Sequence, residues 1–443
     1  MSQLALDPHA AVIGTAGGVA EGALTTADGK PLKASLAAAN AHRRRRAFLL
    51  VLPLLLFVLV TFIAPIGQML LRSVSDPRFI EYEDLGTGEV TPVMVNLREW
   101  FAANPQGTEP DEAAYAALAA DLVVLGELRA QGNVGTRINY DAPGTRSLFT
   151  KSTRRADDVE APFKEGMLDI DDGWDDPVLW QAMRGASSRY TPNFYLAALD
   201  MERAPDGSVR QVSEQQRVYV MLFQRTAILS VVITVLTLIL GFPVAHLLAT
   251  LPLRYSNLLM IFVLLPFWTS LLVRTTSWIV LLQSQGVVND IGVWGGIIDD
   301  GNRLQMIYNQ TGTIIAMTHI LLPFMVLPLY SVMRPINPSY VRAARSLVAT
   351  SWTAFRRVYL PQTVPGIGAG ALLVFILAVG YYITPALVGG SDGQLISNLI
   401  AFHMQKSLNW SLAAALAALL LGGVLILYWL YDRIVGIDNL KLG

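Results

Sequence analysis

Cysteine is absent from this chain of 443 residues, and charged side chains are scarce. A chain without cysteine cannot form a disulfide framework, an iron–sulfur cluster or a thiolate metal site. The five histidines show no metal-ligand spacing such as His-x-x-x-His. Charged residues make up 15% of the chain, whereas soluble domains usually carry roughly 25%. The low charge argues against an ordinary soluble protein.

Three sequence motifs of catalysis are also missing. We find no GxxxxGK[ST] phosphate loop, no convincing GxSxG and no HExxH. The sequence therefore predicts a protein that is not an enzyme, that does not hydrolyse nucleotide itself, and that binds no metal and no cofactor of its own.

Apolar residues are abundant, at 53% of the chain, and they gather in long blocks. A block of about 20 apolar residues is long enough to cross a bilayer as a helix. The blocks predict an all-α membrane protein with six transmembrane helices, at residues 47–71, 221–250, 257–283, 312–333, 367–389 and 410–431. Pro266, Pro323 and Pro385 fall in these spans and are expected to mark bends.

Arginine placement predicts the orientation of the helices. Four arginines, 43–46, precede the first span, and further arginines follow the second and fourth spans. Because basic loops stay in the cytoplasm, both termini are expected on the cytoplasmic side of the membrane. The first apolar block is too long and too far from the N-terminus for a cleaved signal peptide. Residues 1–46 are expected to be a disordered tail because they contain few large apolar residues.

Residues 72–218 differ from the rest of the chain because they are polar and carry acidic clusters. We expect an extracytoplasmic insert domain between the first two spans. The stretch DEAAYAALAADLVVLGELRAQG predicts one amphipathic helix that ends at Gly132. Trp100, Trp174 and Trp180 predict a small packed core.

The segment VRAARSLVATSWTAFRRVYLP, residues 341–361, lies between the fourth and fifth spans. It is basic and rich in helix-forming residues, and Pro338 precedes the expected helix start. Phe355, Val358 and Tyr359 share one face at helical spacing. The pattern predicts a helix–turn–helix on the membrane surface, and the simplest interpretation is a loop attracted to anionic lipid.

The same segment resembles the "EAA" loop of the membrane subunits of ABC importers. That pattern is Glu-Ala-Ala, three residues, Gly, nine residues, then Ile-x-Leu-Pro. Five positions match it, at Ala343, Ala344, Val358, Leu360 and Pro361. Two positions depart: Arg342 stands where the family has Glu, and Val348 where it has Gly. Since Gly permits a tight bend, Val348 puts the shape of that bend in question.

The resemblance extends to most of residues 220–431, through stretches such as LLPFWTSLLVRTTSWIVLLQ and GYYITPALVGG. These look like permeases of spermidine/putrescine importers. The resemblance implies a type I ABC importer permease, with its core at 219–443 and an ATPase-coupling loop at 335–362 that includes Leu347 and Phe355. The implied partners are a dimeric ABC ATPase that holds ATP and Mg²⁺, a second permease in a heterodimer, a periplasmic solute-binding protein and the lipid membrane; no nucleic acid is expected.

Arg274 is the best candidate for a residue on the solute path, because an ionisable group inside a membrane is a functional candidate by default. Other candidates are polar or aromatic residues in apolar spans, namely Trp268, Thr269, Ser270, Thr275, Tyr381, Tyr382 and Thr384. Each also has a structural interpretation, as an interfacial anchor or as a contact between helices.

The cargo stays open at this point. The predicted spans contain no Asp or Glu, so this chain alone offers a polyamine only aromatic faces. Iron(III), sulfate or an opine are alternative cargoes. A membrane-anchored sensor and a secondary transporter are alternative classes.

Overall fold

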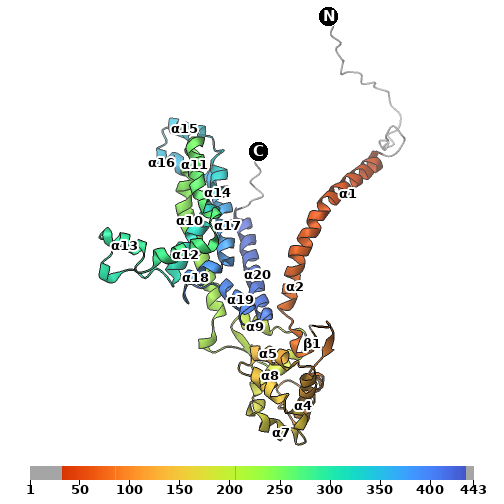
Figure 1. Cartoon of the computed structure of the whole chain (residues 1–443). Helices are drawn as coiled ribbons and strands as arrows, with labels where there is room; N and C mark the ends of the chain where they lie inside the picture. Colours follow the sequence, from red (N-terminus) through yellow and green to blue (C-terminus); the bar gives the residue numbers. More distant parts are fainter. Residues whose placement is uncertain (1–31, 85, 205, 436–443) are drawn as a thin grey trace, which may run out of the picture. The chain divides into compact units, whose positions relative to one another are not determined.

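The computed structural model describes residues 32–84, 86–204 and 206–435. The chain divides into a unit that ends at Gln68 and a unit that begins at Met69, and each is described by itself. Helices dominate both (Figure 1).

The first unit is a continuous helical run. Helix α1 (Leu32–Val58) passes through one π-helical turn, η1 (Leu59–Ile63), into α2 (Ala64–Arg72). The stretch Arg43–Arg72 is long and apolar enough to cross a membrane. The predicted disorder of 1–46 is wrong from Leu32 onward, because the alanines there favour helix and extend the apolar run that follows. Residues 1–31 lie outside the described part.

The insert consists of short helices around one core. Its elements are η2 (Pro77–Phe79), β1 (Glu81–Glu83), β2 (Val90–Pro92), α3 (Val95–Ala103), α4 (Glu112–Glu127), α5 (Gln131–Asp141), α6 (Arg146–Ser152), η3 (Ala156–Asp158), α7 (Phe163–Ile170), η4 (Asp172–Asp175), α8 (Pro177–Ala186), α9 (Asn193–Ala198), β3 (Met201–Arg203), β4 (Val209–Gln211) and η5 (Glu214–Gln216). The predicted core is confirmed, since Trp100, Trp174 and Trp180 are all buried in it. The all-α prediction missed two small antiparallel hairpins, β1–β2 and β3–β4.

The single helix predicted to end at Gly132 is wrong. Helix α4 ends at Glu127, and Gly132 lies inside α5. The chain reverses at Arg129, which has a left-handed φ of 53°. The amide of Ala130 donates to the carbonyl of Leu125 and that of Arg129 to Gly126, which closes the helix end. Burial of Leu125 and Ala130 in the core favours this turn, which local sequence does not signal.

The second half of the larger unit is a helical bundle. Its elements are α10 (Tyr219–Thr250), α11 (Leu253–Leu264), η6 (Leu265–Trp268), α12 (Leu271–Leu282), α13 (Val287–Trp294), η7 (Asp300–Asn302), α14 (Gln310–Met333), α15 (Ser339–Ser346), α16 (Ser351–Ala354), η8 (Phe355–Tyr359), α17 (Leu360–Gly380), α18 (Ile383–Val388), α19 (Ile396–Gln405) and α20 (Trp410–Val435). Helices α10, α14 and α17 pack together around Met325. Glycine is needed for this close packing at two positions. A Cβ at Gly241 would lie 3.1 Å from Met325, and a Cβ at Gly370 would lie 2.8 Å from it, both closer than an ordinary contact.

Within the described residues, five helices are long and apolar enough to span a membrane, or six if one bent pair forms a single span. The bent pair corresponds to the predicted third span, 257–283, which is therefore not one straight helix. It bends by 97° between Trp268 and Leu271. Pro266 lacks an amide hydrogen at this point, and Ser270 restarts the chain as the cap of α12, with its hydroxyl accepting from the Val273 amide at 3.2 Å.

The predicted fifth span, 367–389, is also interrupted, since α17 ends at Gly380 and α18 begins at Ile383. Pro323 does not break its helix, which runs on through α14. The expectation of a bend at Pro323 is therefore not supported by a helix interruption.

Candidate functional site

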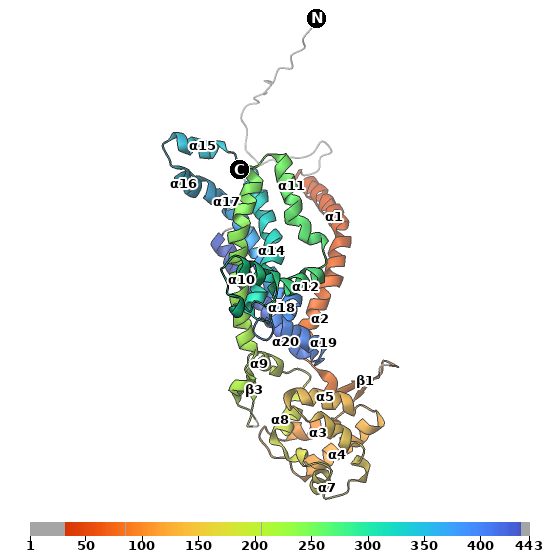
Figure 2. The same cartoon turned by 60° about the vertical axis from the view of Figure 1, so that its left-hand side comes forward.

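The basic segment forms the predicted helix–turn–helix. Helix α15 starts directly after Pro338, and Thr350 caps α16 by accepting from the Thr353 amide at 3.2 Å. Figure 2 shows α15 and α16 at the end of the bundle opposite to α9 and the insert. One π-helical turn, η8, then joins α16 to α17.

Val348 makes the turn between α15 and α16. Its φ is 64°, in the left-handed region. The Ala349 amide donates to the Ala344 carbonyl and the Val348 amide to the Arg345 carbonyl, both at 3.1–3.2 Å. This is a Schellman turn with Val348 at the position that usually holds glycine. The bend of the loop is thus retained although the residue that favours it is missing.

Aromatic side chains attach one face of the loop to α10. Trp352 stacks on Phe355 with ring centroids 5.7 Å apart, and Phe355 stacks on Tyr359 at 5.8 Å. The Tyr359 hydroxyl lies 3.0 Å from Nδ1 of His246 in α10. Phe355 also meets Phe242 of α10 edge to face at 6.2 Å. The loop is therefore in direct contact with α10 through these rings.

The opposite face of the loop is exposed. Leu347 is 82% exposed and Val348 92%. Trp352, although stacked on Phe355, is also 68% exposed. Large apolar side chains left exposed at a turn, as at Leu347 and Val348, are typical of an interaction surface. Of the other predicted loop residues, Arg342, Ala343 and Pro361 are exposed, whereas Val358 and Leu360 are half-buried.

Arg334 connects the same ends of α14 and α10. Its Nη1 donates to the carbonyls of Ala249 and Leu251, at 2.7 and 2.9 Å. These carbonyls lack helical partners because α10 ends there, and a cation at a helix C-terminus is favourable. The arginine that indicated orientation in the sequence also closes the end of a helix.

The two helix breaks bring several predicted path residues together. Thr275 of α12 lies 3.2 Å from Thr384 of α18, hydroxyl to hydroxyl. Arg274 lies close enough to Tyr381 and to His319 of α14 for its charge to act on both rings. The Nε of Arg274 is buried without a hydrogen-bond partner. Non-helical backbone at membrane depth is tolerated where it lines a cavity or is covered by protein, which fits these breaks.

His319 is a member of this group that the sequence analysis missed. Its Nδ1 accepts from Nε1 of Trp278 at 3.1 Å, so the ring is neutral and carries its proton on Nε2. The sequence feature that could have identified it is a single histidine inside the apolar α14.

The remaining path candidates lie in the two breaks themselves. Trp268 is exposed, Thr269 bonds the Pro266 carbonyl, and Ser270 serves as a helix cap. The carbonyl of Tyr382 accepts from the Asn398 side chain at 2.7 Å. These contacts support the backbone at the two breaks.

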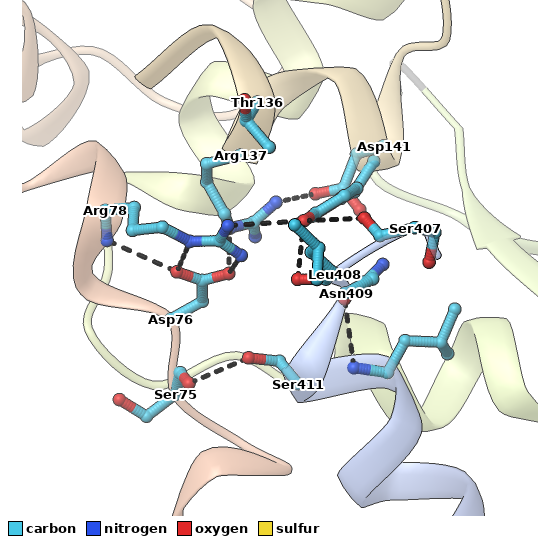
Figure 3. A network of polar contacts seen from close by, with 12 residues as sticks. Ser75, Asp76, Arg78, Thr136, Arg137, Asp141, Ser407, Leu408, Asn409 and Ser411 are labelled. Carbon is cyan, nitrogen blue, oxygen red and sulfur yellow. Dashed lines mark hydrogen bonds and ion pairs between the residues drawn. The ribbon is translucent and has the colours of Figure 1, made fainter. Parts of the chain in front are cut away.

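A buried charge cluster joins the insert to the chain just before α20 (Figure 3). Arg137 of α5 is fully buried, donates to Asp141 at 2.7 Å and lies 3.8 Å from Asp76. Asp76 also pairs with Arg78. Burial alone would lower the pKa of Arg78, but its hydrogen bonds and charge contact with Asp76 raise that pKa above its ordinary value.

Two hydrogen bonds cross from this cluster to the bundle. Tyr140 donates to the Leu408 carbonyl at 2.9 Å, and Ser411 donates to the Ser75 carbonyl at 3.2 Å. An apolar contact extends the junction, since Phe194 of α9 packs with Leu412 and Leu416 of α20. The insert is therefore held on the ends of α19 and α20. Sequence analysis identified none of these residues.

Comparison with known proteins places the bundle in a family. The model described as "Binding-protein-dependent transport system inner membrane component" matches residues 230–435. The spermidine/putrescine transport system permease protein PotB of Escherichia coli (strain K12) is 34% identical over 210 residues, which cover 47% of this chain and 76% of that protein. PotB of Haemophilus influenzae is 34% identical over 214 residues, covering 48% and 74%.

Less similar proteins include transporters named for other solutes. The sulfate transport system permease protein CysT of Escherichia coli is 28% identical over 126 residues, 28% of this chain and 46% of that protein. A crystal structure of a bacterial ABC transporter involved in the import of alginate is 21% identical and covers 52% of this chain, with a TM-score of 0.42. The matches to PotB decide the assignment: the chain belongs to the binding-protein-dependent transport system inner membrane components, the permease subunits of ABC importers.

Proposed function

We propose that this chain passes polyamines such as putrescine and spermidine from a periplasmic binding protein to the cytoplasm by alternating access. A dimeric ABC ATPase on separate chains binds ATP and Mg²⁺ and drives the cycle, and a second permease completes the path. The identity with PotB over three quarters of that protein supports the cargo. Each ligand must bind one state of the transporter more tightly than the other for the coupling to exist.

The geometry of the loop at 335–362 carries the proposal. One face holds an exposed apolar edge, Leu347 and Val348, which suits a groove on the ATPase. The other face is attached to α10 through Tyr359 and His246. Closure of the ATPase would push the loop, and the stacked aromatic rings would carry that movement to α10 and α17. Both termini and this loop then lie in the cytoplasm, with the insert outside.

The composition of the spanning helices supports selection of the cargo by other subunits. Helices α10, α11, α12, α14 and α17 contain no Asp or Glu, so they give a polycation no opposite charge. A binding protein that selects the cargo, or acidic residues from the second permease, would supply the recognition. Arg274 and the similarity to CysT favour a second candidate, an importer of a small anion such as sulfate.

Reconstituted transport tests the function. The complete transporter, in liposomes with ATP inside and the cognate binding protein outside, is expected to take up labelled putrescine or spermidine. Competing sulfate should not reduce this uptake. Uptake without ATP, or failure of any nucleotide-binding chain to purify with this protein in mild detergent, would refute the importer proposal. ATP-dependent uptake of sulfate alone would refute only the cargo.

A further inference from the structure

A cavity of about 360 Å³ opens in the insert, away from the coupling loop and from the two helix breaks. Its walls come from the end of α3, the loop at 107–110, α7, η4 and α8. Helices α3, α7 and α8 can be followed in the insert in Figure 2. Pockets for small molecules have volumes of about 300–1,000 Å³ and combine apolar walls with a few polar groups that orient the ligand. The size of this cavity therefore suits a small molecule.

Aromatic rings form one wall of this cavity. Trp100, Phe101 and Trp180 line it and pack edge to face, with ring centroids 5.5–6.3 Å apart. Nε1 of Trp100 donates to Asp111 at 2.9 Å, and Nε1 of Trp180 donates to the Trp174 carbonyl at 2.7 Å. Because both indole rings are fixed by these bonds and by burial in the core, the wall is formed without a ligand.

Arg184 of α8 offers free hydrogen-bond donors to the cavity. Its Nη1 donates to the carbonyls of Phe101 and Asn104 at 3.0 and 2.8 Å, which fixes the guanidinium at the end of α3. Its Nε and Nη2 bond to no described residue, and neither atom is enclosed, so both open into the cavity that Arg184 lines. These two nitrogens lie on one edge of the planar guanidinium, and such an edge matches the two oxygens of a carboxylate.

Opposite charges are kept apart in this cavity. Burial lowers the pKa of Arg184, and no neighbouring carboxylate offsets that effect. Glu109 and Asp175, which also line the cavity, therefore lie away from the guanidinium. Asp175 is 3.9 Å from Nζ of Lys164, whereas Glu109 and Arg184 belong to no ion pair among the described residues. The cavity thus has a cationic side at Arg184 and an acidic side at Glu109 and Asp175.

We infer that this cavity binds a small molecule with one carboxylate and one amino group, the chemistry of a free amino acid. The carboxylate accepts from Nε and Nη2 of Arg184, the ammonium group lies at Glu109 and Asp175, and the apolar part lies against the aromatic wall. A dianion would meet the two carboxylates, and a polyamine would meet Arg184 and Lys164, so neither suits the cavity. The inference does not depend on the proposed cargo or on the partners in transport.

Calorimetric titration of the full chain in nanodiscs with each of the standard L-amino acids tests this inference. At least one amino acid is expected to bind. Its amine analogue without the carboxylate, and its N-acetyl derivative without the ammonium charge, should each bind about ten-fold more weakly or worse, because each loses one charge-assisted contact. Saturation should also change the tryptophan fluorescence, since Trp100 and Trp180 line the cavity.

Two substitutions separate binding from folding. Arg184→Gln removes the carboxylate-binding edge, but it also removes the bonds to Phe101 and Asn104. Gln181→Glu keeps Arg184 and those bonds, and it places a carboxylate in the cavity one turn before Arg184, where it competes with the carboxylate of the ligand. Arg210→Gln, at an exposed arginine of β4 that lies outside this cavity, is the matched control.

Both test variants are expected to raise the Kd about ten-fold or more, while Arg210→Gln leaves it unchanged. Circular dichroism and a thermal melt show whether each variant is folded, and Gln181→Glu decides the matter if Arg184→Gln does not fold. Unchanged binding in a folded test variant overturns the inference, and so does the failure of every amino acid to bind. Binding of the amine analogue or of putrescine as tight as that of the amino acid would identify a site for amines alone, which also overturns it.

Discussion

Replacing Val348 with glycine should stabilise the turn of the loop. A left-handed conformation costs a residue with a Cβ about 1–2 kcal/mol, and Val348 adopts it with φ 64°. Glycine avoids that cost but loses about 0.5–1 kcal/mol more conformational entropy on ordering. The side chain is 92% exposed, so little packing is lost. The net gain is about 0.5–1 kcal/mol.

Hydrogen exchange of the amides at 348 and 349 measures this gain, because both are bonded inside the turn. In protein reconstituted into nanodiscs, Val348→Gly should slow their exchange about two- to five-fold, the factor that corresponds to that free energy. Ala349→Gly is the matched control. Its φ is not left-handed, so the same change one residue later should speed exchange. Exchange in Val348→Gly that is as fast as in the control would refute the strain argument.

Three further predictions concern the loop and the insert. Arg342→Glu should retain co-purification with the ATPase, whereas Val348→Asp should lose it by placing a charge in the apolar edge; the opposite pattern in a pull-down would contradict the docking surface. Tyr359→Phe removes one hydrogen bond to His246, worth about 0.5–1.5 kcal/mol, and should reduce ATP-driven uptake while ATPase binding stays normal; a loss of both would instead indicate a misfolded loop. Arg137→Ala removes a fully buried side chain and the ion-pair partner of half-buried Asp141, and should destabilise the insert by about 2–5 kcal/mol. Faster proteolysis of the insert would show this loss, and unchanged resistance would show that the cluster does not hold it.

Much of the coupling loop could be predicted from local sequence. The Ala-Ala and Val-x-Leu-Pro spacing marked the segment, and Pro338 marked its first helix. The shape of the turn could not be read from the sequence, because Val348 argues against the left-handed conformation that it adopts. Neighbouring hydrogen bonds from Ala349 and Val348 stabilise the turn despite the local preference.

The solute path could be predicted less completely. Arg274 stood out as a charge in an apolar span, but the two rings on which its charge acts, His319 of α14 and Tyr381 directly after α17, come from other parts of the chain. Their closeness depends on the breaks before α12 and after α17, and a proline predicts a break only in part, since Pro323 sits inside an unbroken α14. Whether a helix bends at a proline depends on which neighbours satisfy the freed carbonyl groups.

The sequence by itself determined the membrane class, the number of apolar blocks and the position of the basic loop, because hydropathy and charge act over short stretches and need no knowledge of contacts. Tertiary structure alone decided how the insert is held, through Tyr140 and Ser411. Those residues come from segments more than 250 positions apart, and a pairing over such separations is set by burial in the folded chain. Tertiary structure also decided that Trp294, at the end of α13, is exposed. Only the folded chain shows which of its apolar residues are left uncovered.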